Sequence, residues 1–159
     1  MHSILTFVPL PVAPTPKVLK SFRKDAGWRE AGDAALNGAF APGSAVQWAA
    51  VLSGKKTIGI VRLELAPPQF CYLSELVILG EHRGQGVGEW FMEQIERFCL
   101  ARGIARVVLQ SRDDSRGFYE KLRFEADPIA AGFLKKDIHP LLRKPAFPFA
   151  RSSLPGFPG

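Results

Sequence analysis

A glycine-rich turn between an apolar run and an amphipathic stretch constrains the fold of this chain more than any other feature. Residues 74–98 read SELVILGEHRGQGVGEWFMEQIERF, so three glycines stand at alternate positions directly after an arginine. The apolar run at 69–79 is too short for a capped, buried helix and is typical of a central strand. Apolar residues recur at helical spacing after the turn and predict a helix over 87–103. A second buried strand is expected at 105–111, so that strand, helix and strand form a right-handed parallel crossover.

The elements on either side of this unit extend the prediction to a single α/β (α+β) domain with a mixed sheet. A hairpin is expected where AVQWAAVL and TIGIVRLELA flank the short SGKK loop. Pro16 suits the first turn of a helix that Gly27 ends. A helix at 113–122 is expected to be capped by Asp113 or Asp114. The hairpin strands cover 45–52 and 57–66, and the other predicted elements are strands at 4–8, 123–127 and 130–137 and a short helix at 29–40.

Composition excludes several classes of protein. The hydrophobic fraction of 47% and the charged fraction of 23% are ordinary for a globular domain. Cys71 and Cys99 lie inside apolar runs without a CxxC pattern, so neither a metal site nor a disulfide scaffold is expected, and a reducing cytoplasm fits best. The first 16 residues and residues 34–54 carry no Asp, Glu, Lys or Arg, yet prolines and polar residues interrupt both stretches. We therefore expect a soluble, cytoplasmic protein that does not enter a membrane.

The C-terminal part of the chain differs from the rest in charge and proline content. From Pro128 onward there are five Lys or Arg and one Asp, which gives +4 of the total net charge of +6. Six of the 13 prolines also lie there, so residues 138–159 are interpreted as a Pro-rich basic tail. Such a tail can attract an acidic partner or simply keep the protein soluble. Nucleic-acid binding is disfavoured, because interleaved aromatic residues are lacking beyond Phe147 and Phe149.

The glycine turn itself is typical of an anion site. Amides at the start of a helix are unpaired, and the helix dipole favours negative charge there. Glycines let a phosphate approach the main chain, and Arg83 can add charge-assisted hydrogen bonds. Two nucleotide-binding patterns do not fit. In a GxGxxG pattern counted from Gly84 the last position falls on Glu89, and no GxxxxGK[ST] run occurs.

Two motifs resemble those of one known family, the GCN5-related N-acetyltransferase (GNAT) superfamily. The segment RGQGVG matches its [Q/R]xxGx[G/A] signature, with Arg83, Gly86 and Gly88 at the fixed positions. The segment GFYEKLRF, about thirty residues downstream, is similar to the second hallmark, FYxKxGF. Arg123 stands where the family usually has glycine, so the turn after Leu122 is expected to differ from the family's. The resemblance covers the chain from Ile4 to Lys136.

The resemblance implies a fold and a co-substrate. The expected fold is a single GNAT-like domain over residues 1–137, in which a parallel strand pair of a mixed sheet is split around acetyl-CoA and helices cover both faces. The pyrophosphate of coenzyme A would lie on the amides of residues 83–88. The pantetheine arm would pair with the backbone of the preceding strand. The coenzyme-binding residues implied in this way are Val77, Ile78, Arg83, Gly84, Gln85, Gly86, Val87, Gly88 and Tyr119. Arg112, which flanks the predicted helix at 113–122, is a further candidate for the phosphates of the coenzyme, with a solvated helix face as the alternative.

Acetyl transfer to an amine needs a base, a group that stabilises the carbonyl oxygen and an acid for the leaving thiolate. Glu75 is the candidate base, through a water, with a surface or hydrogen-bonding carboxylate as the alternative; Glu64 is the reserve. The resemblance implies that Tyr119 meets the sulfur of coenzyme A as the acid, and core packing is the alternative. His82 is interpreted as a loop residue that faces solvent.

The expected function is acetyl-CoA-dependent N-acetyl transfer to a primary amine of a small molecule or of a peptide or protein. A non-catalytic acyl-CoA-binding regulatory module on the same fold is the alternative. The presence of Glu75 together with Tyr119 favours the enzyme, since a binding module needs neither. The sequence does not identify the acceptor, and it leaves a homodimer open.

Overall fold

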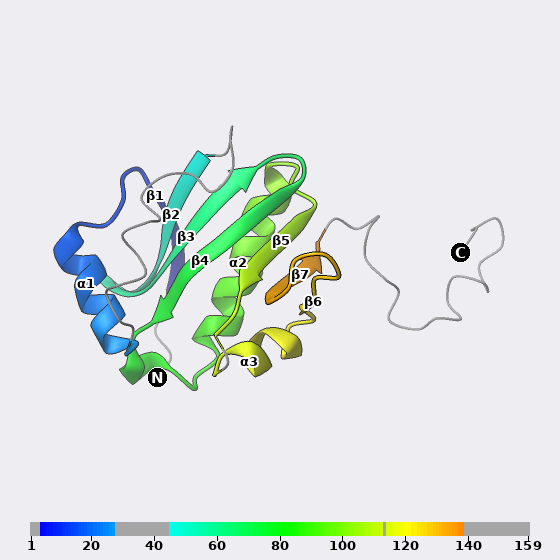
Figure 1. Cartoon of the computed structure of the whole chain (residues 1–159). Helices are drawn as coiled ribbons and strands as arrows, with labels where there is room; N and C mark the ends of the chain where they lie inside the picture. Colours follow the sequence, from blue (N-terminus) through cyan, green and yellow to red (C-terminus); the bar gives the residue numbers. More distant parts are fainter. Residues whose placement is uncertain (1–3, 28–44, 113, 139–159) are drawn as a thin grey trace.

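The computed structural model describes residues 4–27, 45–112 and 114–138, which form a seven-stranded mixed sheet with helices (Figure 1). The strand order is β1-β2-β3-β4-β5-β7-β6. In chain order the elements are β1 (Leu5–Leu10), α1 (Pro16–Asp25), β2 (Ala45–Ser53), β3 (Lys56–Ala66), β4 (Phe70–Ile78), the 3₁₀ turn η3 (Gly80–His82), α2 (Val87–Ala101), β5 (Arg106–Gln110), α3 (Arg116–Lys121), β6 (Glu125–Ala126) and β7 (Phe133–Asp137).

The pairs β1–β2, β2–β3 and β3–β4 are antiparallel, and β4 and β5 form the parallel pair. Helix α2 connects these two strands, so the predicted crossover is confirmed. Helices α1 and α2 lie on opposite faces of the sheet (Figure 1). Neighbouring residues of β3 show this division, because Ile60 packs with Phe22 of α1 whereas Val61 packs in the cluster that contains α2. The expected arrangement, with helices on both faces of a mixed sheet, is therefore confirmed.

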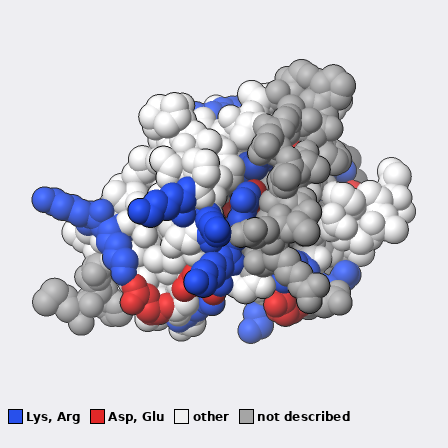
Figure 2. Space-filling model, turned by 60° about the vertical axis from the view of Figure 1, so that its left-hand side comes forward, with Lys and Arg blue, Asp and Glu red and all other residues white. Residues whose placement is uncertain are grey.

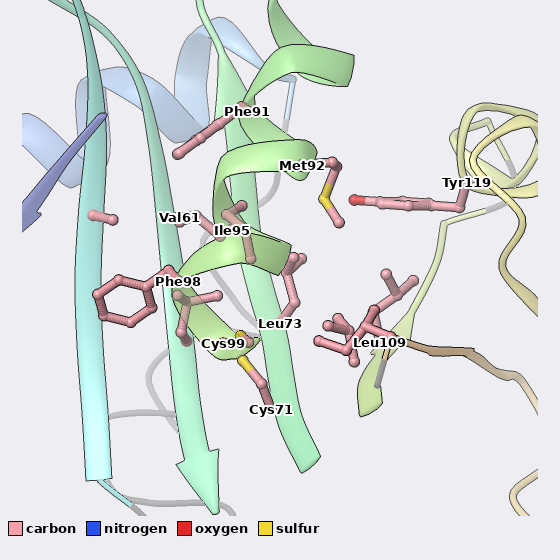
Figure 3. Packing of buried hydrophobic residues seen from close by; sticks show 14 of the residues in the cluster. Val61, Cys71, Leu73, Phe91, Met92, Ile95, Phe98, Cys99, Leu109 and Tyr119 are labelled. Carbon is pink, nitrogen blue, oxygen red and sulfur yellow. The ribbon is translucent and has the colours of Figure 1, made fainter. Parts of the chain in front are cut away.

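The larger part of the core lies between the sheet and α2 (Figure 3). The apolar stripe predicted for α2 faces this core, and each of its members is buried. These residues are Phe91, Met92, Ile95, Phe98 and Cys99. Burying one such side chain stabilises the fold by about 1.5–3 kcal/mol, so the stripe fixes which side of α2 meets the sheet.

The parallel pair separates part of the way along its length. Strand β4 pairs with β5 only from Cys71 to Leu73. Further along, the register between β3 and β4 shifts: Ile60 faces Val77 but Arg62 faces Ser74, so β4 contains one extra residue. An extra residue of this kind is a β-bulge, which bends the strand that carries it. The bulge lies just beyond the last pair with β5, at the split that the family resemblance implies.

The sequence placed the start of α3 too early. The helix begins at Arg116 after Ser115, and no side-chain hydrogen bond caps it. Asp114, the described member of the two predicted capping residues, instead lies 3.9 Å from the guanidinium of Arg112. The capping prediction is therefore wrong for Asp114, because Ser115 bonds back to the carbonyl of Arg112 and an extra turn precedes the helix. Asp113 lies outside the described residues.

The end of α3 keeps the conformation that the family's glycine would adopt. Arg123 has a φ of 74°, in the left-handed region that glycine normally occupies. The amide of Phe124 donates to the carbonyl of Tyr119 at 3.1 Å, and the amide of Arg123 donates to that of Glu120 at 3.0 Å. These two bonds form a Schellman motif. The arginine is therefore accommodated, at a backbone cost of roughly 1–2 kcal/mol.

Several remaining boundaries differ from the sequence prediction. Strand β7 begins only at Phe133, and β6 is confined to Glu125–Ala126. The predicted helix at 29–40 lies outside the described residues. Ile138 is fully buried in the core, one residue beyond the predicted domain end. None of the helices in the described ranges is long and apolar enough to cross a membrane.

Candidate active site

A cleft of about 410 Å³ opens where β4 and β5 separate. Its walls are Tyr72–Ile78 of β4, the chain from Leu109 to Arg112, and α3 with Phe118 and Tyr119. The cleft brings together six of the residues that the sequence singled out. They are Glu75, Val77, Ile78, Arg83, Arg112 and Tyr119.

The glycine turn follows the end of β4 and leads into α2. Gly84 and Gly86 have φ values of 75° and 81°, a conformation that side-chain-bearing residues rarely adopt. A Cβ at either position would meet nothing within 4 Å, so both glycines are needed for their backbone angle and leave open space around the turn. The amides of residues 84–88 donate no hydrogen bond to another described residue. The turn therefore presents a row of unsatisfied N–H donors next to the cleft.

Gly88 is required for a different reason. It lies in the first turn of α2, and a Cβ there would come within 3.2 Å of the ring of Phe118. The missing side chain lets α3 approach the start of α2. Val87 beside it is buried and anchors the helix start in the core.

The guanidinium of Arg83 is engaged within the chain. Its Nε donates to the carbonyl oxygen of Ile78 at 2.8 Å, and its Nη2 donates to Oδ2 of Asp25 at 3.0 Å. Gln85 donates to the carbonyl oxygen of Glu81 at 3.2 Å. These side chains hold the turn in shape, while the amides of the turn remain available.

Val77 and Ile78 form the wall of the cleft along β4. Both are buried, and on the β3 side they face Ile60 and Gly59. On the β5 side the ladder has already ended at Leu73. Their backbone therefore borders the gap, where an extended ligand can take the place of the absent strand.

Glu75 lies at the bulge and is strained and buried. Its φ is 51°, and the residue is 7% exposed. Both carboxylate oxygens accept from Arg23 of α1: Oε2 from Nε at 3.0 Å and Oε1 from Nη2 at 2.6 Å. Each carboxylate oxygen has two lone-pair positions, so a water in the cleft can still donate to Glu75.

Tyr119 occupies the opposite wall. Its ring makes edge-on contacts with Phe118 and Phe124, and in Figure 3 its hydroxyl points toward Met92 of α2. Burial raises the pKa of Tyr119 to about 12. No described residue hydrogen-bonds to its hydroxyl. The phenol is therefore protonated at neutral pH, and Tyr119 lines the cleft.

The remaining candidates take different places. Arg112 lines the cleft, with a side chain that is 52% exposed. Glu64 is fully buried, hydrogen-bonded to Arg62 at 3.0 Å, and does not line the cleft, so it is not placed to replace Glu75. His82 lies in the loop after β4, and its Nε2 is 3.4 Å from Oε1 of Glu81.

The structure adds residues that the sequence did not indicate. Arg23 and Asp25 of α1 reach the site although they lie more than fifty positions before their partners. No sequence pattern links positions so far apart. Ser74 also lines the cleft, and its buried Oγ has no hydrogen-bond partner among the described residues.

The electrostatics of this side suit an anionic ligand. Figure 2, in which the side that carries α1 is turned forward, shows many Lys and Arg side chains with a few acidic groups between them. Lys17, Lys20 and Lys24 of α1 are exposed. A positive surface of this kind raises the local concentration of anions. Within the described ranges, no group of three or more His, Cys, Asp or Glu is placed to hold a metal ion.

The mixed sheet, with a parallel pair that separates beside a turn of free amides, is the arrangement that the resemblance to the GNAT acetyltransferases implies. The model of the Acetyltransferase (GNAT) family matches residues 15–124, and the chain belongs to this family. The curated proteins include GCN5-related N-acetyltransferase 2, chloroplastic, of Arabidopsis thaliana, which is 32% identical over 74 residues. That match covers 46% of this chain and 29% of the plant protein, so the chain spans less than a third of that relative.

Solved structures show the same fold. Tetrahymena GCN5 matches with a TM-score of 0.65 and 17% identity, over 85% of this chain and 97% of the other. A GNAT family acetyltransferase from Elizabethkingia anophelis with acetyl-CoA bound matches with a TM-score of 0.62 and 14% identity, over 84% and 97%.

Proposed function

We propose that the protein is an acetyl-CoA-dependent N-acetyltransferase that acts on a primary amine of a small molecule or of a peptide or protein. The observation that carries the proposal is the row of free amides at residues 84–88 beside the gap between β4 and β5. Free amides at a helix start suit a pyrophosphate, and an open strand edge suits the amide-containing pantetheine arm. The bound acetyl-CoA in a structure of similar fold supports this assignment.

In this proposal the base and the acid lie on two different walls of the cleft. Glu75 accepts the proton of the acceptor amine through a water. The amine nitrogen forms a bond to the thioester carbon, a backbone amide near Val77 or Ile78 stabilises the negative oxygen, and the C–S bond breaks. Tyr119 gives its proton to the departing thiolate and regains one from solvent, to which Glu75 releases the proton that it took from the amine. The sum is an acetylated amine and free coenzyme A.

A second candidate is a non-catalytic acyl-CoA-binding module. One observation favours it: both oxygens of Glu75 are already bonded to Arg23, as expected for a structural carboxylate. The two candidates share coenzyme binding and differ in turnover. Release of free thiol in the presence of an amine therefore separates them.

The first experiment measures acetyl-CoA binding by calorimetry in the wild type and in Gly86→Val. A branched side chain at Gly86 would project beside the free amides, so binding should be lost. Gly103→Val is the matched control, because Gly103 also has a positive φ, 73°, and open surroundings, but lies just after the far end of α2. Both variants carry backbone strain, and only the first should lose the coenzyme. Unchanged affinity in folded Gly86→Val would contradict the proposed site.

The second experiment screens acceptors. Amines, aminoglycosides and peptides are incubated with acetyl-CoA, and free thiol is measured. We expect turnover with at least one primary amine and none with the corresponding alcohol. Binding of acetyl-CoA without turnover on any amine would favour the non-catalytic module.

We further propose that the protein acts in the cytoplasm. Cys71 and Cys99 are both buried and free, as expected for a reducing compartment. The chain is either a monomer or a homodimer, and the molar mass of the full chain measured by light scattering distinguishes the two.

A further inference from the structure

The last turn of α1 contacts the acetyl-CoA site at two points. Arg23 reaches the bulge of β4 at Glu75 with two hydrogen bonds. Asp25, two residues on, reaches the loop after β4: its Oδ2 accepts from the amide of Gly80 at 2.8 Å and from Arg83 at 3.0 Å. The two contacts flank Val77 and Ile78, the segment that borders the gap.

The first contact maintains a strained backbone. Glu75 has a φ of 51°, which a non-glycine residue keeps only when its surroundings enforce it. Arg23 makes a bidentate hydrogen bond to the carboxylate of Glu75, whose side chain is 4% exposed. The ladder between β4 and β5 stops at Leu73, two residues before Glu75. Arg23 therefore contacts β4 at the bulge, just beyond the last β4–β5 pair, where the gap begins.

The second contact shapes the turn that carries the free amides. Arg83 is fixed between Asp25 and the carbonyl of Ile78, so it ties the end of α1 to the end of β4. The amide of Gly80 bonds to the same carboxylate oxygen. Without the Asp25 carboxylate the loop loses both of these bonds and keeps the 3.4 Å bond from Nη2 of Arg83 to the main-chain carbonyl of Asp25. The turn that carries the amides of residues 84–88 would then be held less firmly.

We propose that Arg23 and Asp25 are positioning residues for acetyl-CoA: Arg23 keeps the gap between β4 and β5 open through Glu75, and Asp25 orients the amide turn through Gly80 and Arg83. This inference rests on the proposed function, since it takes acetyl-CoA as the ligand of the cleft. Neither residue needs to touch the coenzyme. Helix α1 thus acts on the coenzyme site from the opposite face of the sheet to α2.

The test measures the dissociation constant of acetyl-CoA by calorimetry in full-length Arg23→Gln and Asp25→Asn. Each should weaken binding at least about fivefold, the lower end of typical coupling between linked sites. Arg23→Lys keeps the positive charge but cannot form the bidentate hydrogen bond with Glu75. Its affinity for acetyl-CoA should lie between those of the wild type and Arg23→Gln. Asp25→Asn keeps an acceptor for the amide of Gly80 and should bind more tightly than Asp25→Ala.

Two further measurements separate positioning from general stability. Arg97→Gln removes an exposed ion pair, Arg97 to Glu93 at 2.8 Å on α2, and should leave the affinity unchanged. In a double-mutant cycle, Arg23→Gln should add little to the affinity loss of Glu75→Gln, because Arg23 acts through Glu75. With an active acceptor, Asp25→Asn should raise KM for acetyl-CoA and leave kcat nearly unchanged.

The outcomes are distinct. Folded Arg23→Gln and Asp25→Asn that bind acetyl-CoA as tightly as the wild type would overturn the inference and leave the proposed function standing. If Arg23→Gln does not fold, normal affinity in both Arg23→Lys and Asp25→Asn would overturn it equally. A wild type that does not bind acetyl-CoA would overturn the proposed function itself.

Discussion

At the scale of single residues, the proposed role of Tyr119 leads to a sharp prediction. Tyr119→Phe keeps the ring and its contacts with Phe118 and Phe124 and removes only the hydroxyl. A hydroxyl that assists the leaving thiolate acts mainly in the transition state, so kcat should fall by about 10²-fold. The dissociation constant of acetyl-CoA should hardly change. Steady-state kinetics and calorimetry on the same preparations give both quantities.

The control for this experiment is the other tyrosine of the chain. Tyr72 also lines the cleft, and Tyr72→Phe should lower kcat far less. Full kcat in Tyr119→Phe with the best acceptor would mean that Tyr119 only packs, and that water or another group is the acid.

The pKa of Tyr119 gives a second prediction at this scale. Burial raises the pKa to about 12 in the folded protein, against about 10 in an unfolded chain. The protonated phenol therefore contributes stability that is fully present below pH 10 and is lost as pH rises through 12. Between these values the wild type should lose up to about 2–3 kcal/mol relative to Tyr119→Phe. Denaturant unfolding of both proteins from pH 8 to 12 measures the difference, and parallel curves would show that the phenol is not buried.

The residues of the site could be predicted from the sequence only as far as local chemistry reaches. Gly84 and Gly86 were predictable, because alternate glycines between a strand and a helix indicate positive φ angles and exposed amides. The strained backbone of Glu75 was not, since nothing in SELVIL indicates a bulge. Its bond to Arg23 depends on how α1 packs, which local patterns do not encode.

At the scale of elements, the close packing of β3 against β4 gives a prediction about the gap. A Cβ on Gly59 would lie 2.7 Å from Cδ1 of Ile78 and 3.2 Å from the carbonyl oxygen of Val77. Gly59→Ala should therefore displace Val77 and Ile78 in the cleft wall. The overpacking should destabilise the protein by about 1–3 kcal/mol. It should also weaken acetyl-CoA binding. Thermal unfolding and calorimetry measure the two effects.

Gly117 offers a control of opposite sign for this substitution. It lies within α3, and a Cβ there meets nothing within 4 Å. Gly117→Ala should therefore stabilise the protein by about 0.5–1 kcal/mol. A Gly59→Ala protein as stable as the wild type would show that β3 and β4 can separate without cost.

Elements with a strong periodic pattern could be predicted, and short ones could not. Helix α2 carries a complete apolar stripe and was predicted within two residues of its observed bounds, Val87–Ala101. Helix α3 has only six residues, and its start depends on the turn that Ser115 makes with Arg112. Strand β6 has two residues and owes its existence to pairing with β7. Tertiary contacts, which a local pattern does not contain, determine these boundaries.

At the scale of the whole molecule, the question is where the folded domain ends. The sequence placed the boundary after Asp137, from the change in proline content and charge. In the structure Ile138 is fully buried in the main core, and its amide donates to the carbonyl of Ala105 at 3.0 Å. We therefore propose that the functional unit extends through Ile138, and that residues 139–159 serve a purpose other than coenzyme binding.

Two truncations that differ by one residue test this boundary. A chain that ends at Ile138 should bind acetyl-CoA with the affinity of the full chain, because every described residue of the core and cleft is retained. A chain that ends at Asp137 loses the buried side chain, and removal of a buried isoleucine costs about 2–5 kcal/mol. Its unfolding midpoint should therefore lie below that of the full chain, whereas the chain that ends at Ile138 should have the same midpoint as the full chain. If the chain that ends at Ile138 also binds the coenzyme poorly, residues 139–159 contribute to the site and the boundary lies further along the chain.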